Sequence, residues 1–550
     1  MSSDVPELVA KILERRGVFA ADYDAFFSPS VRDLAAPDEL PGAVEAAEAL
    51  VAAARAGKRI VVFGDYDCDG VCATAILVKA LSAIGAEVSP FLPERLSEGY
   101  GMSDASVERM LAANPGVGLV VTVDNGINSV EQVASLRARG VEVIVTDHHL
   151  PGETLPECLA VVNPKVSHLG RLEDLCGAGV AFMIARHMLR VAFGDHPERS
   201  PGISPFLVLA GLATVTDVMP LLGQNRILVF EGLRLFSKYA PYGLSELLNR
   251  ASKTASDNIQ ARDFGFALGP RLNAAGRMAS AMEALRLVMA TDREQARQLA
   301  VQVDMRNGER RSVELKMTEE ASARLVPGAP VQIIDLDEGH QGVAGIVAAR
   351  ILERIRSEGA AVPVCVAVCG HGSARAPEGY NIRDALAAAS DALTSFGGHA
   401  AAGGYTVAEG RGELFRELLA RACAAQAKTH PDCSEGVLRF DTWVDPSEIT
   451  MDLVKSLSRL EPFGEGNPEP VFAVKGVVFS DIRPIGENGR HVRLSSKSCS
   501  DAIWWHRGNK VEELRAAAHS PFDIIFAPFV STYGEDHVEL RVCGLRKSVD

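Results

Sequence analysis

The stretch that decides the fold is Arg59-Ile60-Val61-Val62-Phe63-Gly64-Asp65-Tyr66-Asp67-Cys68-Asp69-Gly70. It joins a β-branched apolar run to a turn rich in aspartate and glycine, and residues 71–84 then show the apolar spacing of a helix. This alternation repeats along the next hundred residues. Further apolar runs lie at 87–92, 119–123, 141–146 and 159–162, with helical patterns between them. Strand–helix repetition with nearly all-apolar strands predicts an α/β domain built on a doubly wound parallel sheet.

The remainder of the 550-residue chain is too long to share that single core. We expect a helical segment over 1–44, the parallel-sheet domain over 45–225, and a helical connector over 226–325 that contains a long helix near 292–320. A smaller α/β domain is expected over 326–430, with strands at 331–334 and 364–368. Short strands and turns over 431–550 predict an all-β, OB-like barrel, with strands near 471–478, 491–495, 501–505, 523–526 and 538–543.

The composition excludes some classes of protein. With 47% hydrophobic and 23% charged residues the chain resembles an ordinary globular protein, and its net charge of −15 argues against a protein that simply coats nucleic acid. Ten scattered cysteines form no zinc knuckle, so we expect reduced thiols. The N-terminus reads as an amphipathic helix without a secretion signal, and no apolar stretch would span a membrane. We therefore expect a cytoplasmic protein with no membrane contact.

Carboxylates and imidazoles follow three of the predicted strands. Asp65, Asp67 and Asp69 come after the first strand, Asp124 after 119–123, and Asp147-His148-His149 after 141–146. Each aspartate alone would more often be a turn residue or a helix cap. The carboxyl ends of parallel strands share one edge of the sheet, however, and buried carboxylates need neutralising cations. Oxygen ligands with one or two imidazoles suit Mn²⁺ or Mg²⁺ better than zinc.

These segments also resemble a known superfamily. The motifs around Asp67, Asp124, His148 and the later Thr216-Asp217 pair are similar, in their order along the chain, to the four motifs of DHH phosphoesterases. The resemblance implies two divalent ions, Mn²⁺ or Mg²⁺, in one active site. By analogy with the superfamily, Asp124 bridges the ions, Asp67 binds one, and the other is held by Asp69, His148 and Asp217. Asp65 contributes catalytically, and His149 lies beside the metals to contact the scissile phosphate or to aid proton transfer.

Downstream segments resemble one branch, the RecJ family. Residues 269–277 (GPRLNAAGR) are similar to a signature between the two RecJ lobes, and 340–348 and 397–404 resemble its DHHA1 domain. Residues 461–468 (EPFGEGNP) resemble the entry to its OB-fold. The likeness extends over about residues 45–550. It implies substrate contacts from seven residues: Arg95, Arg271, Asn273, Arg277, Ser373, Arg375 and His399.

One departure from the family pattern concerns the contact to a 5′ phosphate. The family reads closer to Ser-Gly-Arg-Ser where this chain has Ser373-Ala374-Arg375-Ala376, so the backbone geometry and one hydroxyl contact are open. In the barrel, aromatic residues and arginines suit base stacking and backbone attraction. Only one of Trp504 and Trp505 can point inward on a regular strand. These residues are Phe472, Trp504, Trp505, Phe526 and Tyr533, with Arg483, Arg490, Arg493 and Arg507.

The resemblance implies a 5′→3′ exonuclease specific for single-stranded DNA, which releases 5′-mononucleotides in repair and recombination. It also implies single-strand-binding protein and a RecQ-type helicase as partners, and we expect a monomer. One alternative is a phosphodiesterase for short oligonucleotides, cyclic dinucleotides or pyrophosphate, which would not need the long connector or the barrel. A non-catalytic scaffold on a decayed fold is another, but it should have lost candidate ligands, and all of them are present.

Overall fold

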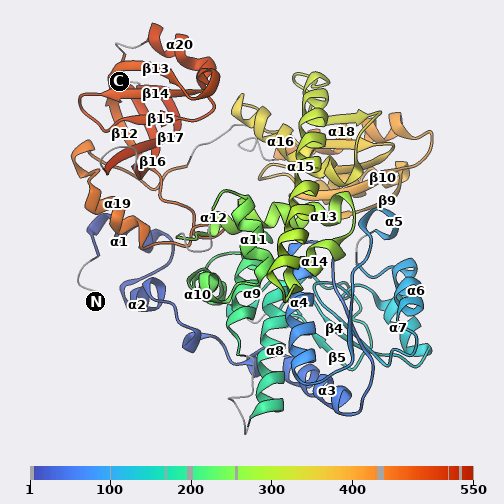
Figure 1. The fold of residues 1–550 in the computed structure, drawn as a ribbon. Helices are drawn as coiled ribbons and strands as arrows, with labels where there is room; N and C mark the ends of the chain where they lie inside the picture. Colours follow the sequence, from blue (N-terminus) through green and yellow to red (C-terminus); the bar gives the residue numbers. More distant parts are fainter. Residues whose placement is uncertain are drawn as a thin grey trace.

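The computed structural model describes residues 5–99, 101–166, 170–194, 202–253, 258–429, 439–517, 520–531 and 536–548. Three separate sheets organise these residues, and each belongs to one body of the molecule (Figure 1). The N-terminal lobe and the middle lobe face each other across the long connecting helix, and the barrel lies to one side of both.

The first sheet is parallel throughout, with the order β2-β1-β3-β4-β5. Alternate strand residues point to opposite faces, so Ile60 and Val62 join one core and Val61 and Phe63 another. Helices cover both faces, which confirms the doubly wound prediction. The strands are β1 (Ile60–Phe63), β2 (Val88–Phe91), β3 (Leu119–Thr122), β4 (Glu142–Thr146) and β5 (Ala160–Val162). One face packs on α3 (Ala43–Arg55), α4 (Cys68–Ala83), α8 (Gly177–Phe193) and α9 (Ser204–Thr216), the other on α6 (Asp104–Ala113) and α7 (Val130–Ala138).

Helices connect this lobe to the next one. The predicted long helix is present as α15 (Arg293–Ala323), which runs for 31 residues. A π-helical turn, Phe264–Leu268, lies earlier in the same connector. The other connector helices are α10 (Gly223–Tyr239), α11 (Tyr242–Arg250), α12 (Ala261–Asp263), α13 (Gly269–Met278) and α14 (Ala281–Met289).

The middle lobe has a mixed sheet with the order β6-β7-β8-β10-β9. Strands β6 (Gln332–Leu336) and β7 (Val364–Val368) match the predicted ones and are parallel. The sequence analysis missed the other three, because β9 is exposed and the β9–β10 hairpin is glycine-rich, so neither shows an apolar alternation. These are β8 (His371–Arg375), β9 (Leu393–Gly398) and β10 (Ala402–Val407), with helices α16 (Gln341–Ser357), α17 (Ile382–Ala387) and α18 (Gly412–Thr429).

The C-terminal body is a seven-stranded sheet in the order β11-β12-β16-β17-β15-β14-β13. Phe472 and Phe526 are buried in its core, whereas Trp505 is 42% exposed, so one of the paired tryptophans does face solvent. Tyr533 lies outside the described residues. The strands are β11 (Thr442–Trp443), β12 (Phe472–Val477), β13 (Phe479–Ile485), β14 (His491–Ser496), β15 (Ala502–Trp504), β16 (Phe522–Ser531) and β17 (His537–Lys547), beside α19 (Met451–Ser458) and α20 (Val511–Ala516). Of these, β11 and β13 were not predicted.

The N-terminal segment packs on this distant barrel. Helices α1 (Glu7–Arg15) and α2 (Tyr23–Phe27) share a hydrophobic core with barrel strands. Buried Arg226 on α10 connects the parts: its Nε donates to the Phe26 carbonyl at 2.9 Å and its Nη2 to the Glu461 carbonyl at 2.7 Å. The guanidinium also stacks on the Phe26 ring at 3.8 Å. Among the described residues, no helix is both long and apolar enough to cross a membrane.

Replacing Arg226 by Met should loosen the barrel from the helical connector. The change leaves two carbonyls without a charged donor, which costs about 2–4 kcal/mol. We expect the melting temperature of the first calorimetric transition to fall by several degrees. Lys238→Met near the end of the same helix is the matched control, because Lys238 is exposed and lies over the ring of the neighbouring Tyr239. Equal melting temperatures for the two variants would contradict the role given to Arg226.

Candidate metal centre and substrate cleft

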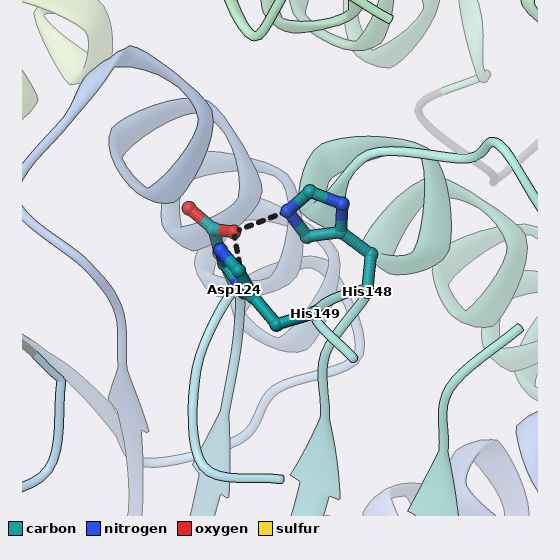
Figure 2. Close-up of side chains that lie close together, drawn as sticks. All are labelled: Asp124, His148 and His149. Atoms are coloured by element: carbon teal, nitrogen blue, oxygen red, sulfur yellow. Dashed lines mark ion pairs between the residues drawn. The ribbon is translucent and has the colours of Figure 1, made fainter. Parts of the chain in front are cut away.

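The candidate metal centre lies where β1, β3 and β4 end. These strands are neighbours in the sheet, so the residues after them meet at one edge. Figure 2 shows Asp124, His148 and His149 converging there. Asp124 has a φ of 62°, which turns its carboxylate back over the strand ends. A Cβ on Gly177 would come within 2.5 Å of the Asp124 Cβ, so only glycine fits at the start of α8.

The side chains form three overlapping sets whose potential ligand atoms lie within 4.8 Å of one another. His148 Nε2 is 3.0 Å from Asp124 Oδ1, 3.6 Å from Asp217 Oδ2 and 3.7 Å from Asp69 Oδ2. Asp124 thus lies between the carboxylates of Asp65 and Asp67 and the residues around His148. This is the arrangement that two ions with a shared carboxylate require. The sets are Asp65, Asp67 and Asp124; Asp69, His148 and Asp217; and Asp124, His148 and His149.

Backbone amides hold several of the carboxylates in place. Asp67 is the N-cap of α4, where its Oδ1 accepts from the Asp69 and Gly70 amides. Both Asp69 oxygens accept from the first turn of α8, Oδ2 from Gly177 N at 2.6 Å and Oδ1 from Ala178 N at 2.7 Å. Helix N-termini favour negative charge, so these contacts orient the carboxylates without neutralising them fully.

Burial makes the cluster electrostatically costly. Desolvation, followed by repulsion from neighbouring aspartates, raises the pKa of Asp65 and Asp124 well above the usual range. The same two causes raise the pKa of Asp69 to about 6 and that of Asp217 to about 9. Burial, and then the charge of His149, lowers the pKa of His148 to about 3, so its ring is neutral and its nitrogens can act as ligands.

Several polar atoms of the cluster are buried without a hydrogen-bond partner. They are Asp65 Oδ1, Asp217 Oδ2 and both ring nitrogens of His148. Buried polar atoms are normally satisfied, and an unsatisfied set indicates a missing ion. Divalent cations would satisfy these atoms and offset the repulsion between the carboxylates. The residues present therefore fit Mn²⁺ or Mg²⁺, which prefer oxygen ligands with few imidazoles.

Asp147 has a contact that the sequence analysis did not assign. Its Oδ1 accepts from the backbone amides of His148 and His149 and lies 2.7 Å from His149 Nδ1, while its Oδ2 accepts from Ile127 N. Burial opposes the charge on His149, but the hydrogen bond and charge of Asp147 prevail and raise the pKa of that imidazole. The motif spacing contained the signal, since a carboxylate before paired histidines is suited to orient one of them.

Three predicted arginines converge beside the metal centre. Arg95 lies over the Tyr66 ring at 5.0 Å. Burial and then the charge of Arg95 lower the pKa of Arg277, to about 10, and that of Arg375. Arg375 is packed against α16, because a Cβ on Gly345 would come within 2.8 Å of its Nη2 and 3.4 Å of Ser373. These cations come from the first lobe, the connector and the middle lobe, and they lie close enough to act on one another. This group of three, called the arginine pocket below, is suited to phosphate.

The two alanines that depart from the family pattern are accommodated. Ala374 is a paired residue of β8, opposite Cys365 of β7, and is fully buried in the core of the middle lobe, so its methyl group adds packing and does not distort a turn. Ala376 follows the strand and is also buried. His399 lies in the β9–β10 hairpin, where its amide donates to Ala402 O at 2.8 Å. Burial, then the charges of His149 and Lys165, lower the pKa of His399.

Two predicted substrate contacts are engaged elsewhere. Arg271 Nε binds Asp304 on α15 at 2.9 Å, and its Nη1 donates to the Ala267 carbonyl. Asn273 Oδ1 accepts from Cys68 N at 2.7 Å, which ties α13 to the start of α4. Asn273 lines one small cavity together with Arg277, four residues further along the same helix, whereas Arg271 lines a neighbouring groove with Asn307 and Arg310. Their predicted contacts to substrate stay predictions.

Comparisons with known proteins agree with this architecture. The profile described as "DHH family, N-terminal domain" matches residues 59–211, and "RecJ OB domain" matches 440–543. The single-stranded-DNA-specific exonuclease RecJ of Thermus thermophilus is 38% identical over 84% of this chain and 66% of its own length. The chain thus spans just under two thirds of that relative. The enzyme of the same name from Escherichia coli is 35% identical over 86% of this chain and 84% of its own length.

Solved structures give the same result. The crystal structure of Thermus thermophilus RecJ with Mn²⁺ matches all of this chain and 77% of that one, at 34% identity and a TM-score of 0.83. The same protein has been solved with Mg²⁺, and that structure matches with a TM-score of 0.78 at 31% identity over 76% of its length. Together with the carboxylate cluster at the strand ends, these likenesses show that the chain belongs to the RecJ family within the DHH superfamily.

Proposed function

We propose that this chain is a 5′→3′ exonuclease that degrades single-stranded DNA to 5′-mononucleotides, in repair and recombination. The observation that carries the proposal is the position of the carboxylate cluster directly beside a pocket of three arginines. The first can hold metal ions at a phosphodiester, and the second can hold a terminal phosphate. The names of the curated relatives, which are single-stranded-DNA-specific exonucleases, support the same activity.

Two divalent cations fit between the strand ends. We assign Asp67 and Asp65 to one ion, and Asp69, His148 and Asp217 to the other, with Asp124 shared between them. When bound, the ions would lower the pKa of a water molecule and stabilise negative charge on the phosphate. Asp147 holds the Nδ1 proton of His149, which leaves Nε2 to donate to a phosphate oxygen or to the departing oxygen.

The arginine pocket sets the polarity of cleavage along the strand. Arg95, Arg277 and Arg375, with Ser373 and His399, would bind the 5′ phosphate of the terminal nucleotide beside the metals. A strand held by its 5′ end is cleaved one nucleotide from that end, which makes the enzyme an exonuclease. Specificity for a single strand is supported by the names of the curated relatives, which are single-stranded-DNA-specific exonucleases.

A groove between the connector and the barrel offers a path for the rest of the strand. It has a volume of about 780 Å³ and is lined by Phe266, Trp505 and Phe529, with Arg262, Lys455 and Arg541 around them. Phe266 projects from the π-helical turn and is 83% exposed, and such aromatic side chains stack well on bases. We place the protein in the cytoplasm as a monomer, consistent with nine described cysteines that are all free thiols. Single-strand-binding protein and a RecQ-type helicase are the partners we propose.

The proposal can be tested with Mn²⁺ and three substrates: a 5′-labelled single-stranded 30-mer, its duplex and a dinucleotide. We expect labelled mononucleotide from the single strand only, and a loss of at least about a thousandfold in Asp124→Asn. Asp104→Asn is the control, because this aspartate lies on the surface at the start of α6. Cleavage of the dinucleotide alone would instead favour the phosphodiesterase for short substrates.

Metal binding should depend on pH. The raised pKa of Asp217, about 9, means that this carboxyl carries a proton at pH 7 when no ion is bound, and Asp69, at about 6, is partly protonated below pH 7. An incoming cation must displace these protons. Mn²⁺ affinity measured by calorimetry should rise at least about tenfold per pH unit from pH 6.5 to 8.5, with proton release that Asp217→Asn reduces by about one proton. Affinity that does not change with pH would contradict the assignment.

Asp147→Asn should reduce turnover while the protein still binds metal. The amide keeps one acceptor oxygen but loses the negative charge, and its NH2 group would face the Ile127 amide that now donates to Oδ2. The side chain must then turn or lose a contact, so the imidazole of His149 is held less firmly. We expect kcat to fall about tenfold to a hundredfold, the usual effect of removing a partner that orients a functional group. Mn²⁺ titration should remain close to that of the unaltered protein. Normal turnover in this variant would show that catalysis does not depend on the contact by which Asp147 orients His149.

A further inference from the structure

The short helix α5 (Arg95–Glu98) occupies a bridging position between the lobes. It follows β2 of the first sheet and packs against α13 of the connector and α16 of the middle lobe. Arg95 begins this helix, and its guanidinium lies beside the pocket formed with Arg277 and Arg375. The position of α5 therefore decides where Arg95 presents its charge.

A helix of four residues cannot hold its own shape. It is far below the length at which helices become stable in water, so its geometry must come from tertiary contacts. Glu98, its last residue, supplies one of them: its Oε2 accepts from the Glu94 backbone amide at 2.8 Å. The side chain of Glu98 is only 7% exposed, which is unusual for a carboxylate on such a short surface element.

Arg109 on α6 completes this contact. Its Nε donates to Glu98 Oε1 at 2.5 Å and its Nη2 to Glu98 Oε2 at 2.7 Å, a bidentate pair. The same Nη2 donates to the Leu92 carbonyl at 2.9 Å, at the end of β2, and the guanidinium stacks on the Phe91 ring at 4.3 Å. Arg109 thus fastens the end of α5 to the rigid parallel sheet. The hydrogen bond from Arg109 also lowers the pKa of Glu98, which keeps the pair ionised.

We propose that Glu98 and Arg109 are positioning residues for substrate recognition, because their pair holds α5 so that Arg95 meets the 5′-terminal phosphate. The inference rests on the proposed function, in which Arg95 binds that phosphate. It assigns a role to two side chains that touch neither the metal cluster nor the arginine pocket directly. Specificity for a phosphorylated end would then depend on an ion pair at the far end of α5.

The test compares single-stranded 30-mers that carry either a 5′ phosphate or a 5′ hydroxyl. Glu98→Gln should lower the preference for the phosphorylated strand, as a ratio of kcat/KM values, by about tenfold, mainly through KM. Arg109→Lys, which keeps the charge but loses the bidentate geometry, should give a smaller loss of the same kind. In an Arg95→Ala background, Glu98→Gln should have no further effect on the ratio.

Glu108→Gln is the matched control, since it breaks an exposed pair with Arg139 from the same helix as Arg109. It should leave the ratio unchanged. The inference is overturned if Glu98→Gln keeps the full preference, if it slows both substrates equally, or if its effect adds fully to that of Arg95→Ala.

Amide hydrogen exchange separates this inference from the proposed function. Exchange at α5 should become faster in Glu98→Gln and stay the same in Glu108→Gln, whether or not the protein cleaves DNA. A wild-type protein without nuclease activity would refute the proposed function. Exchange at α5 would still show whether the Glu98–Arg109 pair holds that helix in place. Unchanged exchange in Glu98→Gln would overturn the inference even in an active enzyme.

Discussion

Repulsion among buried carboxylates at the ends of β1, β3 and α9 is the constraint on which the rest of this structure depends. Asp65, Asp69, Asp124 and Asp217 all have raised pKa values, because burial and their mutual proximity both disfavour the charged form. The fold brings them together through a parallel sheet that is buried on both faces and cannot easily relax. Divalent cations relieve this repulsion, so the fold is built to bind them.

Three parts of the chain together supply the opposite charge. The chain is acidic overall, at −15, yet arginines from the first lobe, the connector and the middle lobe meet beside the carboxylates. Opposite charges placed side by side at a lobe interface suit a phosphodiester, whose negative charge must be held while metal ions approach it. The glycines of α16 serve this purpose, since a side chain at Gly345 would displace Arg375.

The parallel sheet and the barrel were predictable because their strands are buried and carry apolar runs. Strands β8, β9 and β10 were missed because they are short, contain glycine and carry few apolar residues, so they leave no periodic signal even though β7–β8 and β9–β10 are hairpins. The metal candidates were found by the order of their motifs, and all of them lie together in the structure. The hydrogen bonds of Arg271 with Asp304 and of Asn273 with the Cys68 amide could not be read from the pattern of α13.

The sequence by itself determined the chemistry of this protein: strand periodicity predicted the sheet, and aspartates after the strands predicted a metal site at its edge. Those inferences need only local pattern and the rule that parallel strands end at one edge. Only the tertiary structure decided which groups act on one another, such as Asp147 on His149 and Arg109 on Glu98. Such contacts depend on the packing of elements whose separation along the chain says nothing about their distance in space.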